Sequence, residues 1–313
     1  HQCGACYTDC QYSPPHEFNV NVPAALAKLR NESYAVYVWP SALSDAFARN
    51  GLVVTLMAAA SVAAFIIGFV AFVDPAALFS AQAGNFYKVM PHNAMVALFG
   101  AVTLYAIAAL TISLRAFWLD INSDAPRSGG LIQATSDSAQ LRYLGDGGGG
   151  CTSESERPSA QRRIFHHFTF YGFLFCFAAT SIATVYHYAF GWRAPYEFTS
   201  LPVLLGIIGG IGLLIGPAGL FVLACQRQSA LTDPAHRGMD TAFLAMLFLT
   251  SLTGFLLMIG RETPAMGVLL AIHLGVVLGL FLSLPYGKFV HGLYRFLALK
   301  KYATERRSAT FVE

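Results

Sequence analysis

Residues 201–224 read LPVLLGIIGGIGLLIGPAGLFVLA, a stretch that contains no Asp, Glu, Lys or Arg. About 20 consecutive apolar residues are enough for an α-helix to cross a lipid bilayer. Five further stretches also lack these four residue types and are long enough to cross: 52–73, 94–114, 168–190, 241–259 and 266–284. The sequence therefore predicts an all-α membrane protein built around a six-transmembrane helix bundle.

The composition of the whole chain agrees with this prediction. Of 313 residues, 55% are hydrophobic and only 12% are charged, whereas soluble domains contain roughly a quarter charged residues. A disordered chain, a disulfide scaffold and an ordinary soluble enzyme are thereby excluded. The net charge of +3 is too small and too diffuse to indicate a nucleic-acid partner. The lipid bilayer is the expected environment.

The distribution of Lys and Arg predicts the orientation of the bundle. Most of these residues lie before the first span, in the loop 115–165, between the fourth and fifth spans, or after the sixth. The remaining connections contain only Lys88, Arg193 and Arg261. Since positively charged loops stay in the cytoplasm, we expect both termini and the loop 115–165 to be cytoplasmic.

The fourth span is rich in glycine. Small residues let membrane helices approach closely, so tight helix packing is favoured over direct contact with a cofactor. The glycines are Gly206, Gly209, Gly210, Gly212, Gly216 and Gly219.

The first ten residues, HQCGACYTDC, place Cys3, Cys6 and Cys10 at C-x2-C-x3-C spacing. This matches the last three cysteines of the C-x2-C-x2-C-x3-C run that binds [4Fe–4S] clusters in bacterial ferredoxins. The first cysteine of that run would directly precede His1, so we expect a longer protein whose upstream residues complete the ligand set. Gln11 stands where the ferredoxin run has Pro.

A zinc site is the alternative for these three cysteines, and the other three cysteines of the chain have separate interpretations. A zinc ion bound by Cys3, Cys6, Cys10 and either His1 or His16 would use the same thiolates. Cys176 and Cys225 lie in or at the end of apolar spans and fit the role of small buried hydrophobic residues. Cys151, in the polar loop, is expected to be an ordinary thiol, with a redox or ligand role as the alternative.

Histidines occur at two depths of the predicted bundle. His166 and His291 lie near the cytoplasmic ends of the third and sixth spans, and His187 and His273 lie toward the opposite ends. Two b-type haems, each held by one imidazole from each of two facing helices, would need this layout. The alternative is that these histidines are interfacial residues bonded to carbonyl groups.

Helical phase refines the choice of ligands. His273 and His291 are 18 residues apart, or five turns, and would share a face if Pro285 did not interrupt the helix. Phase relative to His187 favours His166 over the adjacent His167. His92, at the start of the second span, is a reserve ligand for the outer haem.

Two basic residues flank His291. Lys288 and Arg295 could pair with haem propionates, but anchoring of the helix end on the cytoplasmic side is the favoured interpretation.

Several of these motifs together resemble the TcuB/CitB family, the membrane electron-transfer proteins of tricarballylate and citrate-related utilisation. The resemblance covers essentially the whole chain. Its quoted segments are HQCGACYTDCQYSPPHEF, FYKVMPHNAM, LRYLGDGGGGCTSESERPSAQRRIFHH, FTFYGFLFCFAATSIATVYHY and PYGKFVHGLYRFLAL.

The resemblance implies an electron-transfer component rather than the catalytic dehydrogenase itself. Its partner would be an FAD-dependent dehydrogenase that oxidises tricarballylate to cis-aconitate. Electrons from the reduced flavin would pass through 4Fe-4S clusters and haem b to the quinone pool of the bacterial inner membrane. A secondary transporter and a zinc-dependent membrane sensor are the alternatives, although ion-coupled carriers commonly place carboxylates in their spans.

The predicted organisation follows from these assignments. We expect a remnant of an iron–sulfur segment (1–50), transmembrane helices 1 and 2 (51–114), a cytoplasmic Gly-rich loop (115–165), transmembrane helices 3 to 6 with haem b (166–291) and a basic cytoplasmic tail (292–313).

Overall fold

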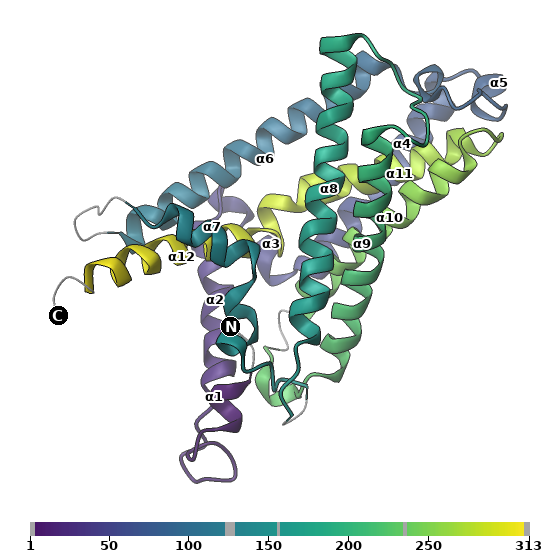
Figure 1. Ribbon diagram of the computed structural model, residues 1–313. Coiled ribbons are helices and arrows are strands. Elements are labelled where there is room, and N and C mark those ends of the chain that lie inside the picture. Colours follow the sequence, from purple (N-terminus) through teal and green to yellow (C-terminus); the bar gives the residue numbers. More distant parts are fainter. Residues whose placement is uncertain (1–3, 123–128, 155–156, 234–236, 310–313) are drawn as a thin grey trace.

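The computed structural model describes residues 4–122, 129–154, 157–233 and 237–309. Its regular structure is helical throughout these ranges (Figure 1). The β-structure found in them is an isolated antiparallel bridge between Cys151 and Ser159. The predicted all-α class is confirmed.

In the ranges just given, six helices are long and apolar enough to cross a membrane. They coincide with the six predicted spans and extend several of them: α4 (Asn50–Phe72), α6 (His92–Ile121), α8 (Gln161–Phe190), α9 (Leu201–Gln226), α10 (Arg237–Gly260) and α11 (Met266–Ser283). Large apolar side chains such as Ile67, Val70 and Leu104 are more than half exposed on their outer faces. Lipid would cover such side chains in a membrane.

The shorter helices gather mainly on one side of the bundle. They are α1 (Ala5–Thr8), α2 (Val22–Tyr37), α3 (Asp45–Ala48), α5 (Pro75–Leu78), α7 (Leu131–Ala139) and α12 (Val290–Ala309). Figure 1 shows α1, α2, α7 and α12 away from α5 and the turn between α10 and α11. We call the two ends of the bundle the α1 end, where α4, α8 and α10 begin, and the α5 end, where α6, α9 and α11 begin.

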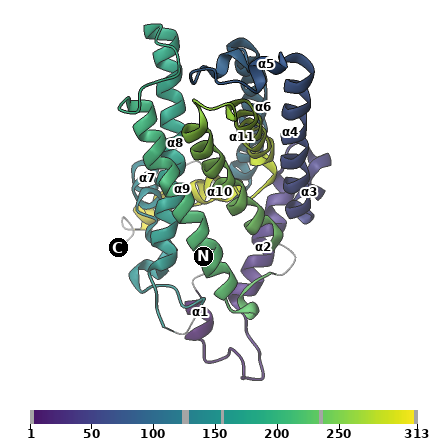
Figure 2. The ribbon, with the colours of Figure 1, turned by 90° about the vertical axis from the view of Figure 1, so that its right-hand side faces the viewer.

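Helices α8 and α9 form the most extensive helix pair, and they lie side by side on one flank in Figure 2. Gly209 and Gly212 share the face of α9 that meets α8. A Cβ atom at Gly212 would lie 2.8 Å from the carbonyl oxygen of Phe168 and 3.0 Å from the Cα atom of Gly172. The two backbones are therefore in contact, which confirms the packing interpretation of the glycine-rich span.

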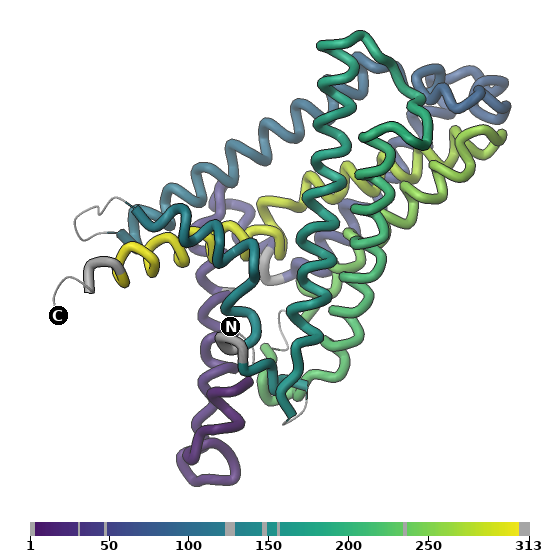
Figure 3. The backbone as a smooth tube through the Cα atoms, in the orientation of Figure 1, coloured from purple at the N-terminus to yellow at the C-terminus, as the bar shows by residue number. Residues whose placement is uncertain are grey.

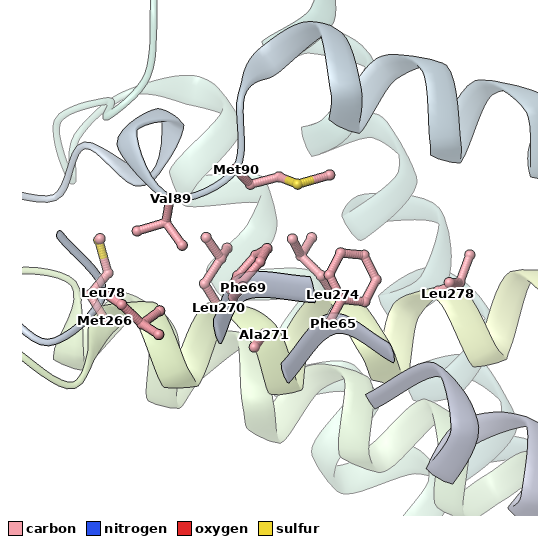
Figure 4. Close-up of a cluster of buried hydrophobic side chains, with 10 residues drawn as sticks. All are labelled: Phe65, Phe69, Leu78, Val89, Met90, Met266, Leu270, Ala271, Leu274 and Leu278. Atoms are coloured by element: carbon pink, nitrogen blue, oxygen red, sulfur yellow. The ribbon is translucent and has the colours of Figure 1, made fainter. Parts of the chain in front are cut away.

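A second close contact joins α11 to α4. A Cβ atom at Gly279 would lie 2.8 Å from the Cα atom of Ala58, and Gly275 meets Val62 one turn away. Toward the α5 end, this helix pair closes over a buried apolar cluster (Figure 4). The cluster consists of Phe65, Phe69, Leu78, Val89, Met90, Met266, Leu270, Ala271, Leu274 and Leu278.

The sixth span does not continue to His291. Helix α11 ends at Ser283, a 3-10 turn covers Leu284–Tyr286, and α12 begins at Val290. Pro285 lies in that turn, where it cannot donate a backbone hydrogen bond and disfavours a continuing α-helix. The buried side chain of Asn50 donates a hydrogen bond to the carbonyl of Tyr286. The interruption at Pro285 that the sequence indicated is therefore present, and the helical-phase argument that would place His273 and His291 on one face does not apply.

After this break the chain turns away from the bundle. The trace in Figure 3 leads through α12 along α6 and α7, and both of these helices contact it. The hydroxyl of Thr304 on α12 donates a hydrogen bond of 3.1 Å to the carbonyl of Gly129, just before α7. Helix α12 thus closes the α1 end rather than extending a span.

The α8–α9 contact yields a stability prediction. Gly212→Ala should destabilise the protein by about 1–3 kcal/mol, because the new methyl group overlaps backbone atoms that cannot move independently. Gly206→Ala on the same helix is the matched control, since its Cβ atom would have only Ala179 nearby, at 3.9 Å. Thermal unfolding of the two variants in the same detergent compares them. Equal melting temperatures would contradict the close-packing interpretation.

Candidate functional site

The predicted cluster cysteines lie at the α1 end. Cys6 is exposed within α1, and Cys10 is half-buried two residues after this helix. Cys3 falls outside the described residues. Within the described ranges, no three His, Cys, Asp or Glu side chains form a group that could hold a metal ion. The ligand role of these three cysteines therefore stays a prediction.

The zinc alternative with His16 is likewise untested. The Nδ1 atom of His16 accepts a hydrogen bond of 3.1 Å from the backbone N–H of Phe18, and its ring packs against Tyr12. This contact orients the ring and leaves Nε2 as the nitrogen that could bind a metal ion.

The cysteine segment docks on the polar loop. The hydroxyls of Thr8 and Thr152 form a hydrogen bond of 3.1 Å. Gly4 has a φ of 86°, and a Cβ atom there would lie 3.0 Å from the backbone nitrogen of Ser153. The carbonyl of Ser153 accepts a hydrogen bond of 3.1 Å from the backbone N–H of Gln228, just beyond α9. The loop therefore joins the cysteine segment to the membrane helices.

Of the remaining three cysteines, Cys225 alone differs from its sequence-based expectation. Cys151 is only 1% exposed, and its thiol donates a hydrogen bond of 3.2 Å to the carbonyl of Leu144. It is a packed part of the loop rather than an accessible thiol. Cys225, expected to be buried, is exposed near the end of α9, whereas Cys176 is half-buried where α8 meets Gly209.

His166 and His291 lie close together at the α1 end, within electrostatic range of each other. The Nδ1 atom of His166 is buried without a hydrogen-bond partner. The adjacent His167 stacks on Tyr171, with ring centroids 5.9 Å apart. The two neighbouring histidines therefore have different surroundings, and the choice of His166 as the ligand stays a prediction.

The imidazole of His291 is held by the chain just before α12. Its Nδ1 atom contacts the carbonyl oxygen of Lys288. Burial lowers the pKa of His291 to about 3, and the Lys288 ammonium acts in the same direction. The ring is neutral at physiological pH, which is the form that binds a metal ion.

At the α5 end the structure places His187 against His92. The two rings stack with centroids 3.9 Å apart and an angle of 15° between their planes. The Nε2 atom of His92 also bonds to the hydroxyl of Tyr188 at 3.1 Å, and Tyr87 meets the ring of His92 edge-on. His92, which the sequence identified as a reserve ligand, is thus the histidine in contact with His187.

His273 has different surroundings. Its Nδ1 atom lies 3.0 Å from the hydroxyl of Thr253 on α10. Gly254 leaves room for the ring, since a Cβ atom there would lie 3.2 Å from Cε1 of His273. Among the described residues, no direct contact joins His273 to His187. Neither Thr253 nor Gly254 stood out in the sequence, because only the pairing of α10 with α11 brings them to His273.

An ion pair joins α10 to the segment before α12. The ammonium of Lys288 lies 2.7 Å from a carboxylate oxygen of Asp240, and the two side chains are 17% and 35% exposed. Burial lowers the pKa of Lys288, while the Asp240 carboxylate opposes this shift. The sequence interpretations of Lys288 as a propionate partner or a membrane anchor both overlooked this intramolecular partner.

Fold and site together define a class: a six-helix membrane protein with a ferredoxin-like cysteine segment docked at one end. The family model described as Citrate utilization protein B matches residues 46–311, and the one described as Citrate utilization protein B Fer4-like domain matches residues 1–36. The chain is 47% identical over 308 residues to Citrate utilization protein B of Escherichia coli, covering 98% of this chain and 81% of that protein. No solved structure matches.

This chain therefore belongs to the Citrate utilization protein B family, and the resemblance to the TcuB/CitB family is confirmed. The Fer4-like match supports an iron–sulfur type of N-terminal domain.

The Lys288–Asp240 pair yields a second stability prediction. Asp240→Asn should lower the free energy of unfolding by about 1–3 kcal/mol, because it leaves a mostly buried ammonium without its carboxylate. This loss is smaller than the loss expected from breaking a fully buried ion pair. Glu32→Gln removes a carboxylate from the exposed Lys28–Glu32 pair and should change stability by less than about 0.5 kcal/mol. Thermal unfolding measures both changes. Equal losses of stability in the two variants would contradict a larger contribution from the Lys288–Asp240 pair.

Proposed function

We propose that this protein is a membrane electron-transfer subunit that reoxidises an FAD-dependent dehydrogenase of the tricarballylate dehydrogenase type. Electrons would pass through 4Fe-4S clusters and haem b to the quinone pool. Membership of a citrate utilisation family and the Fer4-like match support this proposal at the coarser level. The residues at the two ends of the bundle support the finer assignment.

The iron–sulfur part of the proposal rests on the donor set at the α1 end. Cys3, Cys6 and Cys10 would supply thiolates at the spacing of the ferredoxin run. Docking of the segment on Thr152 and Ser153 places Cys6 at the same end of the bundle as His166. A short route between the two kinds of cofactor requires this arrangement.

The observation that carries the haem assignment is the orientation of His273 and His291. A metal-bound histidine commonly has its second ring nitrogen hydrogen-bonded to an oxygen of the protein, which fixes the ring. The Nδ1 atoms of both residues meet such an oxygen, from Thr253 and from Lys288. This leaves Nε2 of each ring to hold iron, and a bound haem b would supply reversible one-electron oxidation and reduction.

The partners of these two residues would come from α8. We assign His166 with His291 at the α1 end, and His187 with His273 toward the α5 end. His166 and His187 are separated by 21 residues of helix, which is about 31 Å at 1.5 Å per residue. One iron cannot bind both, so the four ligands correspond to two haems. His92, stacked on His187, is the competing partner at the α5 end.

The distribution of charge supports the assigned orientation. Arg162 and Arg163 open α8, and Arg237 opens α10, all at the α1 end. By the positive-inside tendency, this end would face the cytoplasm of a bacterium, with the protein in the inner membrane. A soluble flavoprotein would then reach the cysteine segment, and quinone would reach the helices from the bilayer.

The haem assignment predicts that His166→Ala reduces the ratio of haem b to protein by about half, because one of two bis-histidine sites loses a ligand. His167→Ala is the matched control, since the adjacent ring stacks on Tyr171. Reduced-minus-oxidised optical spectra and a quantitative haem assay of the purified protein measure this ratio. Unchanged haem in His166→Ala would refute this ligand, and a protein with zinc but no b-type band would overturn the proposed function.

A parallel comparison tests the outer pair. His273→Ala should also remove about half of the haem, while His92→Ala should retain it, because our assignment gives the second iron to His187 and His273. The same spectra and haem assay apply. If His273→Ala keeps its full haem content and His92→Ala loses about half of it, the assignment of His273 is overturned and His92 is the ligand.

A further inference from the structure

A cavity of about 360 Å³ opens at the α1 end, between α2, the end of α9, the start of α10 and the segment before α12. Four cationic side chains from these four elements line it: Arg30, Arg227, Arg237 and Lys288. They are up to about 260 residues apart in the chain, and only the folded structure brings them together.

The acidic residues of this cavity do not balance these charges. Within the part of the chain that the structure describes, Asp233 and Asp240 are the two acidic lining residues, and Asp240 forms an ion pair with Lys288. Two carboxylates neutralise at most two of the four cations, whichever cations they pair with. Arg162 lies within electrostatic range of Arg227 and Lys288, and the Glu154 carboxylate, which also acts on Arg227, offsets its charge. Counted over the described residues, the cavity therefore holds an excess of two positive charges.

This excess is partly withdrawn from water. The side chain of Lys288 is only 17% exposed. Burial lowers the pKa of Arg227 to about 10, and Arg162 and Arg30 act in the same direction. Like charges crowded in a region of reduced dielectric constant repel one another strongly. A bound anion would relieve this repulsion.

The wall of the cavity also offers hydroxyl groups on a fixed framework. Ser229, Thr232 and Thr241 line it. The guanidinium of Arg237 donates a hydrogen bond of 2.9 Å to the hydroxyl of Thr232. The side chain of Asn21 donates one of 2.7 Å to the carbonyl of Ala230, which ties α2 to this wall.

We propose that this cavity is a binding site for an oxyanion of the phosphate class. Guanidinium groups present paired N–H donors that match phosphate oxygens, and hydroxyl groups complete such sites. The oxyanion could be dissolved phosphate or the headgroup of an anionic phospholipid, because basic pockets at the cytoplasmic ends of membrane helices recognise such headgroups. The site is independent of the proposed redox function.

The test uses the purified chain in a non-ionic detergent. Inorganic phosphate should raise the melting temperature in a saturable manner when chloride keeps the ionic strength constant. Arg227→Gln should weaken the apparent phosphate affinity by roughly tenfold, as expected for one charge-assisted contact. Arg142→Gln is the matched control, because Arg142 pairs with Asp137 outside the cavity.

Two outcomes would overturn the site: a phosphate response no larger than that to chloride, or a response that Arg227→Gln retains in full. Arg237→Gln, at a more exposed position, serves as the second variant if Arg227→Gln does not fold. Loss of the phosphate response in this variant supports the site, and full retention contradicts it.

A separate arm identifies the source of the oxyanion. The protein is placed in nanodiscs of phosphatidylcholine with or without cardiolipin, and native mass spectrometry counts bound lipid. Cardiolipin retained by the unmodified chain and lost from Arg227→Gln assigns the site to a lipid headgroup. A phosphate response without cardiolipin enrichment assigns it to the dissolved anion, and the absence of both effects refutes the site.

Discussion

The contact on which the arrangement of the membrane helices depends is the direct approach of the α8 backbone to α9. Lipid is as apolar as a leucine side chain, so membrane helices associate through close packing rather than through a hydrophobic driving force. Gly209 and Gly212 allow this packing, because a Cβ atom at either would lie within 3 Å of an atom of α8. The glycines of α9 thereby set the position of a helix that bears both His166 and His187.

Helix α8 determines the depth of His166 and His187 in the bundle, and the neighbouring helices surround their rings. His166 and His187 lie near opposite ends of α8 simply because the helix is long enough to cross the bilayer. Their ring environments come from elsewhere, since His187 stacks on His92 of α6 and His166 lies near His291 of α12. A single helix thus carries two histidines that meet different neighbouring helices.

Sequence reasoning found the features that depend on short stretches of chain. Six spans follow from hydropathy, and tight packing follows from the glycines of α9. It failed where distant segments meet. Pro285 indicated the break before α12, but nothing in the sequence indicated that the side chain of Asn50 donates a hydrogen bond to the carbonyl of Tyr286 in that break. The contact of His92 with His187 likewise required the relative placement of α6 and α8, which no local pattern encodes.

Charged side chains are excluded from the predicted spans and are concentrated where the helices end. This placement orients the helices and also brings like charges close together. Cationic side chains at the cytoplasmic ends of membrane helices orient those helices. This role does not require the cations to lie close to one another, and each could be solvated separately. Here Arg227 ends α9, Arg237 begins α10 and Lys288 precedes α12, yet all three line one cavity. Because their mutual repulsion rises as they leave water, convergence at one point is better explained by a shared anionic partner than by orientation alone.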